Sequence, residues 1–249
     1  AGIAFVACVP VDYIDSDAFY YAIDTSGEID ALRATDPVAG AMNLYFTENL
    51  ANESGSFCGI SSFSWQASQG VVMMNACTAA WGNPSTLSHE VGHYFDLYHT
   101  HETAFGWECV DGSNCETAGD RICDTPADPR LNRCNPGGNQ YCVSFDCLYF
   151  GEFTDPCHAD LYEPLVDNFM AFSRPSCRES FTFRQSEKMK ATLIHLRADH
   201  LLEPAGMEHG AGRADGHADG GGTGGGAGQG TGRGAGRGKP GGTAPHPGQ

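Results

Sequence analysis

The segment "LSHEVGHYFDLYHT", residues 87–100, decides the fold of this chain. Within it, His89 and His93 are four residues apart, so on an α-helix both imidazoles lie on one face, one turn apart. Val91 and Tyr94 fall on the opposite face of the same helix. The segment therefore predicts a helix whose back lies in a core and whose two histidines face a cleft.

His99 is the third candidate ligand, and it can reach the same ion only if the helix ends soon after His93. A continued helix would place His99 about 15 Å along the axis from His89, whereas zinc–nitrogen bonds are about 2.0–2.1 Å long. We therefore expect a sharp turn between the second and third histidines. Glu90 flanks the histidine pair and can take a proton from a metal-bound water without being a ligand. This pattern predicts zinc held by three histidines, with Glu90 as the catalytic base.

Asp96 stands at this turn, where a positive φ reverses the chain at the lowest cost. Glycine adopts this conformation most readily, and aspartate is among the other residues that tolerate it best. The cost is roughly 1 kcal/mol, which is small beside the roughly 10–16 kcal/mol with which structural sites bind zinc. Asp96 therefore weakens the pattern without forbidding the site. His101 could also approach the metal, but we expect it to be a surface histidine.

The alternative is that these histidines line the polar face of an ordinary helix. A lone H-E-x-x-H occurs by chance, so by itself it leaves both interpretations open. The offset of His99, the phase of the apolar face and the many cysteines all favour zinc.

The composition separates a tail from a folded body. Of the 33 glycines, 19 lie between residues 206 and 248, and a segment with so few apolar side chains cannot offset its ordering entropy. We expect a disordered glycine-rich tail at 206–249 and one folded domain at 1–205. An RNA-binding role for "GRGAGRGKP" is the lesser alternative, because its basic residues are few.

The net charge excludes some classes of binding partner, and the cysteine content indicates the redox compartment. The formal net charge of −17 argues against nucleic acid and anionic membranes as partners. No apolar run approaches the ~20 residues of a membrane span, so we expect no membrane insertion. The cysteines indicate an oxidising compartment with several disulfides, and their odd number leaves at least one without an intramolecular partner. There are eleven, at positions 8, 58, 77, 109, 115, 123, 134, 142, 147, 157 and 177.

Local patterns predict an α+β fold. Residues 101–166 are rich in Cys, Pro, Gly and Asp, with disulfides expected to staple them. Thr182 and Gln185 form a capping box that opens a final helix. Four apolar runs predict strands, at 3–11, 41–50, 58–65 and 70–79. The apolar stripe of the final helix is predicted to comprise Met189, Leu193, Leu196 and Leu201.

Four ordered motifs resemble those of the pappalysin-type metzincins, a family of secreted zinc endopeptidases. The segment "LSHEVGHYFDLYHT" departs from the family's L-x-H-E-x-G-H-x-x-G-L-x-H-T only at Asp96. "GDRICDTPADP" at 119–129 matches a G-D-x-x-x-D-T-P-A signature, and "NFMAFS" at 168–173 partly matches the Met-turn N-Y-M-D-Y-S. "FTFRQ" at 181–185 matches the F-T-x-x-Q that starts a helix. The resemblance covers residues 43 to 197.

The resemblance implies a metzincin-like catalytic domain with a mixed twisted sheet, an active-site helix and a Cys-rich C-terminal subdomain that ends in a helix. It divides the body into an upper subdomain at about 1–99 and a lower subdomain at about 100–205. Family domains begin with a strand and a long backing helix ahead of the strand that 3–11 resembles. Neither is visible in this sequence, so the chain looks N-terminally incomplete, which would also explain the unpaired cysteine.

The resemblance also gives a role to Met170 and to the strand at 58–65. Met170, in the Met-turn, would form a hydrophobic floor beneath the zinc. The strand would hold extended substrate by strand addition, although an ordinary sheet strand explains its sequence equally well. Phe172 departs from the family, which has a tyrosine there that assists transition-state stabilisation. A phenyl ring cannot donate a hydrogen bond, and losing one such donor typically costs about 10²–10³ in rate.

The loop at 119–129 resembles a region that carries structural calcium in some members of the family. Its candidate oxygen donors are Asp120, Asp124 and Thr125. The alternative is an Asx-turn loop tied down by Cys123.

These observations predict a secreted zinc-dependent endopeptidase, acting on a protein or peptide substrate through a zinc-bound water activated by Glu90. The alternative is a catalytically weak or inactive zinc-binding module of the same fold, used for protein recognition, which Phe172 and Asp96 favour. Glu90 opposes this alternative, because a site that only binds zinc needs no general base. A third possibility is an inert fragment that does not fold alone.

Overall fold

The structure is a computed structural model that describes residues 2–7, 11–17, 19, 23–78, 85–134 and 140–201. The chain divides into two compact units, residues 1–202 with 247–249 and residues 203–246, and every described residue lies in the first. The glycine-rich tail expected at 206–249 lies outside the described residues.

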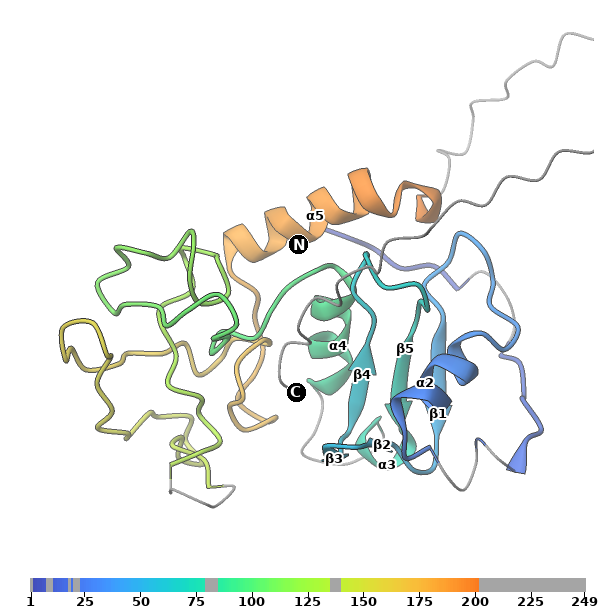
Figure 1. The fold of residues 1–249 in the computed structure, drawn as a ribbon, viewed down its shortest axis with the longest axis horizontal. Helices are drawn as coiled ribbons and strands as arrows, with labels where there is room; N and C mark the ends of the chain where they lie inside the picture. The colour runs from blue at the N-terminus through green and yellow to red at the C-terminus, as the bar shows by residue number, and fades with distance from the viewer. Residues whose placement is uncertain are drawn as a thin grey trace, which may run out of the picture. The chain divides into compact units, whose positions relative to one another are not determined.

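The first unit contains a three-stranded mixed sheet (Figure 1). Its order is β1 (Leu44–Thr47), β5 (Val71–Met74) and β4 (Gly59–Ser61), with β1 parallel and β4 antiparallel to β5. Three of the four predicted strands are therefore confirmed, each shorter than its apolar run. A separate antiparallel pair, β2 (Ala51–Asn52) with β3 (Gly55–Ser56), lies between β1 and β4 in sequence. The short helix α3 (Asn75–Thr78) follows β5 directly.

Each face of the sheet packs against different helices, because side chains alternate along a strand. Val72 of β5 belongs to a core cluster with Ile29 and Leu32 of α2 (Ser26–Arg33). This helix was not predicted, although Thr25 and Glu28 form a complete capping box at its start.

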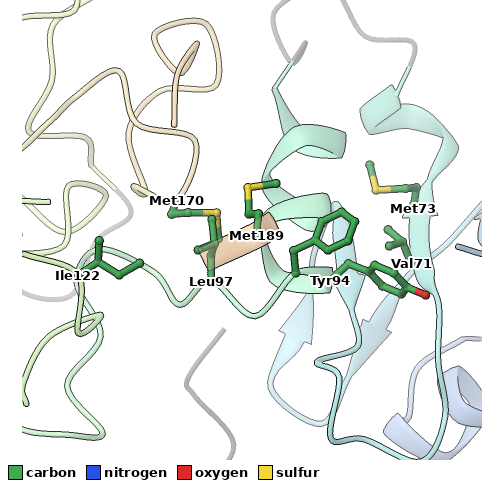
Figure 2. Packing of buried hydrophobic residues seen from close by; sticks show 8 residues of the cluster. Val71, Met73, Tyr94, Leu97, Ile122, Met170 and Met189 are labelled. Atoms are coloured by element: carbon green, nitrogen blue, oxygen red, sulfur yellow. The ribbon is translucent and has the colours of Figure 1, made fainter. Parts of the chain in front are cut away.

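The opposite face of β5 presents Val71 and Met73 to a second cluster, which reaches into the loop-rich part of the chain. Figure 2 shows this cluster running from β5 past Tyr94 and Leu97 to Met170 and Ile122. The cluster joins α4 (Thr86–Tyr94) and α5 (Phe183–Leu196) to the sheet and to the segment after α4.

The first predicted strand is wrong. Residues 3–7 and Val11 are described and lie in no strand, while residues 8–10 lie outside the described residues. Phe5 and Val6 are more than half exposed, and Ile3 packs against the second cluster. A continuous apolar run does not distinguish a buried strand from a segment that packs on a core without joining the sheet.

The final helix is confirmed, with both hydrogen bonds of the Thr182–Gln185 capping box present. Of its predicted stripe, Met189 is buried and Leu193 packs against the core, as expected. Leu196 and Leu201 are wrong, since they are 63% and 48% exposed. The helix ends at Leu196, so Leu201 lies beyond it, where the 3.6-residue helical period no longer directs a side chain towards the core.

From His101 to the start of α5, the described residues form no helix or strand, only three isolated bridges. Disulfides take the place of regular structure, as the sequence predicted. Four lie in this segment, Cys109–Cys157, Cys115–Cys123, Cys134–Cys142 and Cys147–Cys177, and Cys58–Cys77 lies in the sheet region. The eleventh cysteine, Cys8, lies outside the described residues.

Candidate metal centre

The helix α4 carries His89, Glu90 and His93, all of them buried. It ends at Tyr94, so His99 lies beyond the helix, as its geometry required. The three Nε2 atoms converge: His89 to His93 is 3.2 Å, His89 to His99 is 3.2 Å and His93 to His99 is 3.0 Å. An ion about 2.0–2.1 Å from each nitrogen in tetrahedral geometry would hold them roughly 3.3–3.4 Å apart. The three histidines therefore fit zinc.

The other ring nitrogen of two histidines is held by a backbone carbonyl. Nδ1 of His89 lies 2.6 Å from the carbonyl oxygen of Phe169, and Nδ1 of His93 lies 2.8 Å from that of Leu97. A carbonyl only accepts, so Nδ1 donates and Nε2 keeps its lone pair for a metal. Burial also lowers the pKa of His93 to about 4 and that of His89 well below its usual value, which keeps both rings neutral.

Asp96 makes the turn between the second and third histidines, with a φ of 65°. This is the left-handed conformation that the sequence required at this position. Its carboxylate, however, does more than tolerate the turn. It accepts hydrogen bonds from the backbone N–H of Ser64 at 2.8 Å, the hydroxyl of Ser64 at 2.7 Å and the hydroxyl of Thr192 at 3.2 Å. Asp96 therefore ties the metal-binding turn to the segment after β4 and to α5, a role that glycine could not fill.

Met170 is completely buried and contacts the helix that carries His89 and His93. Its sulfur packs against Gly92 on α4, where any Cβ would overlap it. The carbonyl of Met170 accepts a hydrogen bond from the N–H of Thr100 at 3.3 Å, and the side chain of Asn168 supports the turn by accepting from the N–H of Met170 at 2.9 Å. The loop at 168–173 thus contacts the metal-binding segment through both backbone and side chain.

Glu90 is buried against β4. A Cβ on Gly59 would lie 2.7 Å from Cγ of Glu90, so the glycine leaves the room in which this side chain lies. Burial raises the pKa of Glu90 to about 8, against the opposing pull of Arg178 and Arg33. A cation held by the three histidines would shift the pKa back towards the carboxylate form.

Strand β4 lies at one end of the sheet, beside α4 (Figure 1). Cys58 and Ser62, at its two ends, bond to the backbone of the β5 side. Because hydrogen-bonding direction alternates along a strand, Gly59 and Ser61 present their backbone N–H and C=O groups to the outer edge. This edge therefore offers a ladder for an extended chain next to Glu90.

His101 is buried, so the expectation of a surface histidine is wrong. Its ring stacks on His99 with centroids 4.9 Å apart, and its Nδ1 is buried without a hydrogen-bond partner. The ring of Phe172 lies 4.4 Å from both imidazoles. His101, two residues after His99, is buried like it because the ring of Phe172 covers both imidazoles.

Arg178 was not singled out from the sequence, yet its guanidinium lies at the centre. Its Nη1 is 3.4 Å from Nδ1 of His89, and its buried Nε has no hydrogen-bond partner. No local pattern marks this position, which follows Cys177 in an irregular segment. Only the fold brings it to the histidines.

The described residues give the calcium expectation no support. Asp120 accepts hydrogen bonds from the N–H of Ile122 and the hydroxyl of Thr125. Asp124 caps α5, accepting from the hydroxyl of Thr182 and the N–H of Arg184. These oxygens are engaged by protein donors, and none of the three-ligand groups found in the described part of the chain includes them.

The chain is similar in sequence to known metalloproteases. The family Peptidase_M43, described as "Pregnancy-associated plasma protein-A", matches residues 38–194. The chain is 30% identical over 168 residues to an extracellular metalloprotease of Pyricularia oryzae, covering 63% of this chain and 50% of that protein. It is 31% identical over 172 residues to an extracellular metalloprotease of Colletotrichum graminicola, covering 64% and 51% respectively. The chain therefore spans about half the length of these curated relatives.

Among solved structures, mature mirolysin of Tannerella forsythia in complex with a cleaved peptide is similar, with a TM-score of 0.47 and 23% identity. The match covers 72% of this chain and 65% of that one. A TM-score of this size is too low to carry an argument about the site. Separately, within the described residues no helix has the length and apolar character needed to cross a bilayer.

Proposed function

The chain belongs to the Peptidase_M43 family of pappalysin-type metalloproteases, and from that premise we propose that it is a zinc-dependent endopeptidase. The observation that carries the proposal is the convergence of three Nε2 atoms within 3.0–3.2 Å, with Glu90 on the same helix. Zinc, when bound there, would polarise the substrate carbonyl and make a water ligand more acidic.

Glu90 is the residue that moves the proton. As a carboxylate it takes a proton from the attacking water, and as a carboxylic acid it delivers that proton to the leaving amine. Its burial beside Gly59 of β4 supports this role, because both steps would then take place away from bulk water. The neutral rings of His89 and His93, fixed by their carbonyl partners, serve only as ligands.

The substrate would bind as an extended strand along β4. The outward backbone groups of Gly59 and Ser61 would pair with the peptide backbone and draw the scissile bond past Glu90. Such binding needs no free chain end, which is why we propose an endopeptidase. The relatives named extracellular metalloproteases, together with five disulfides, support secretion as the setting.

The test compares the full chain with its Glu90→Ala variant. We expect both proteins to bind one zinc per chain, and we expect only the unaltered chain to cleave a peptide library. Removing a general base typically lowers the rate by about 10²–10⁴. Zinc binding with no cleavage, or cleavage that Glu90→Ala leaves unchanged, would refute the mechanism.

Phe172 favours a second candidate, a weak or inactive zinc-binding module. Its ring packs on His99 and His101 and offers no hydrogen-bond donor to a developing oxyanion. If the chain is a slow enzyme, Phe172→Tyr should raise the turnover rate by up to about 10². If it is a recognition module, this substitution should leave cleavage at background.

A further inference from the structure

Arg178 forms no ion pair within 4.0 Å with any carboxylate in the part of the chain that the structure describes. Its Nε is buried and has no hydrogen-bond partner. A guanidinium has five N–H donors and stays protonated, so leaving it partly buried without an anion costs free energy.

The contact with His89 does not satisfy this guanidinium. Nδ1 of His89 lies 2.6 Å from the carbonyl oxygen of Phe169 and must donate its hydrogen to it. The Nη1 of Arg178, 3.4 Å away, is therefore a donor that faces another donor. When Nε2 of His89 binds a metal, this arrangement is fixed, because the tautomer can no longer change.

Glu90 is the carboxylate that Arg178 influences, but it does not pair with it. Arg178 is the largest influence that opposes the rise in the pKa of Glu90. The two groups nevertheless lie beyond the 4.0 Å of an ion pair, since no ion pair among the described residues joins them. Arg178 thus lies beside His89, with its buried Nε unpaired and no ion-pair partner among the described residues.

We propose that Arg178 binds a carboxylate of the substrate beside the scissile bond, so that this centre selects acidic peptides. The proposal rests on the proposed peptidase function. A planar guanidinium binds a carboxylate through two parallel hydrogen bonds, and the unpaired Nε of Arg178 can donate one of them. The carboxylate belongs to an Asp or Glu side chain of the substrate.

The net charge of −17 does not oppose this selection at short range. In physiological salt the Debye length is about 8 Å, so charges spread over the surface are largely screened at the centre. A partly buried pair beside His89 is screened much less. Local recognition therefore decides which peptide binds.

The cleavage experiment uses the zinc-loaded full chain with three matched peptides. One has an amidated C-terminus and an internal Glu next to the cleaved bond, the second has Gln in its place, and the third ends in a free carboxylate after the cleaved bond. We expect the internal Glu to raise kcat/KM at least about tenfold over Gln, the lower end for a charge-assisted hydrogen bond. A rise for the free C-terminus alone would overturn the proposal. Arg178→Gln should bring the Glu-to-Gln ratio close to one, and Arg178→Glu should favour Lys at the same position. Arg184→Gln, which removes an exposed arginine on α5, should change nothing.

A binding experiment separates this proposal from the failure of peptidase activity. In the Glu90→Ala background, where no cleavage is expected, fluorescence anisotropy should show the Glu peptide binding at least about tenfold tighter than the Gln peptide. Adding Arg178→Gln should abolish that difference. Equal binding of both peptides, or a preference that survives Arg178→Gln, would overturn the proposal. An equal fall of kcat for all peptides with an unchanged Glu-to-Gln ratio would overturn it too, since Arg178 would then act only through Glu90.

Discussion

Two regions of this molecule reach a defined structure by different means. The sheet region, residues 23–78 and 85–100, is built on strands and helices whose apolar side chains form one core cluster and most of a second. The stapled region, residues 101–134 and 140–182, has no helix or strand among its described residues and is closed by four disulfides. Yet both contribute to the candidate metal centre: the first provides the three histidines, and the second provides Phe172 and Arg178, which contact them, and Met170, which contacts Gly92. The three histidines are thus held by the sheet region, and the residues around them are held by a segment that disulfides close.

The largest effect should come from opening the longest covalent loop of the stapled region. Cys109→Ala with Cys157→Ala removes a link across 48 residues, for which loop entropy predicts a loss of about 4 kcal/mol in unfolding free energy. Cys115→Ala with Cys123→Ala spans only 8 residues and should cost about 2.5 kcal/mol. Urea unfolding measures both.

Hydrogen exchange should show that this loss is local. In the Cys109 and Cys157 variant, amides of the stapled region should lose more protection than amides of β5. Equal loss in both regions would mean that the two regions unfold as one unit, and the contrast between them would fail.

The contact between the regions can be broken at Gly92. Gly92→Ala would place a Cβ against the sulfur of Met170, so we expect an unfolding free energy lower by about 1–2 kcal/mol, because overpacking outweighs the gain in helix propensity. Zinc affinity should fall with it, since Met170 supports the centre. The matched control is Gly27→Ala on α2, whose nearest contact is Thr25 Oγ1 at 4.0 Å. The Gly27→Ala variant should be more stable than the unaltered chain by about 0.5–1 kcal/mol. Thermal unfolding of both variants measures these changes.

Asp96 tests whether the departure from the family motif is a defect. Asp96→Gly relieves a positive φ worth roughly 1 kcal/mol but removes three accepted hydrogen bonds. We expect a net loss of about 1–2 kcal/mol, measured by urea unfolding at a fixed zinc concentration. Asp96→Ala should lose about 1 kcal/mol more, because alanine keeps the strain. A glycine variant as stable as the unaltered chain would show that the hydrogen bonds contribute nothing.

The stability of the stapled region should also depend on pH. Burial, followed by Asp120 and Asp128, raises the pKa of Glu108 from its ordinary 4.5 to about 8. Folded Glu108 therefore holds its proton where the unfolded chain releases it, so its contribution to stability is full below about pH 4.5 and is lost as the pH rises through about 8. In the Glu108→Gln variant, the unfolding free energy measured by urea titration should change less between pH 5 and 8. If this substitution left the pH dependence of the unfolding free energy unchanged, a group other than Glu108 would be responsible for it.

The metal centre was predictable because its key features are local. Two histidines four residues apart share a helix face, and His99 needs a turn that Asp96 can make. The capping box at Thr182 was equally local, and so was the start of α5. Three of four strands agreed with apolar runs, whereas the run at 3–11 failed because an apolar run does not by itself show that a segment joins the sheet.

By itself, then, the amino-acid sequence determined the metal-binding helix, the need for a reversal after it and the oxidised, stapled character of residues 101–166. Only the tertiary structure decided which cysteines pair, what the carboxylate of Asp96 binds, that His101 is buried and that Arg178 lies unpaired beside His89. The physical reason is sequence distance. Helix faces, caps and turns depend on residues a few positions apart, whereas these contacts join residues that only the packing of the whole chain brings together.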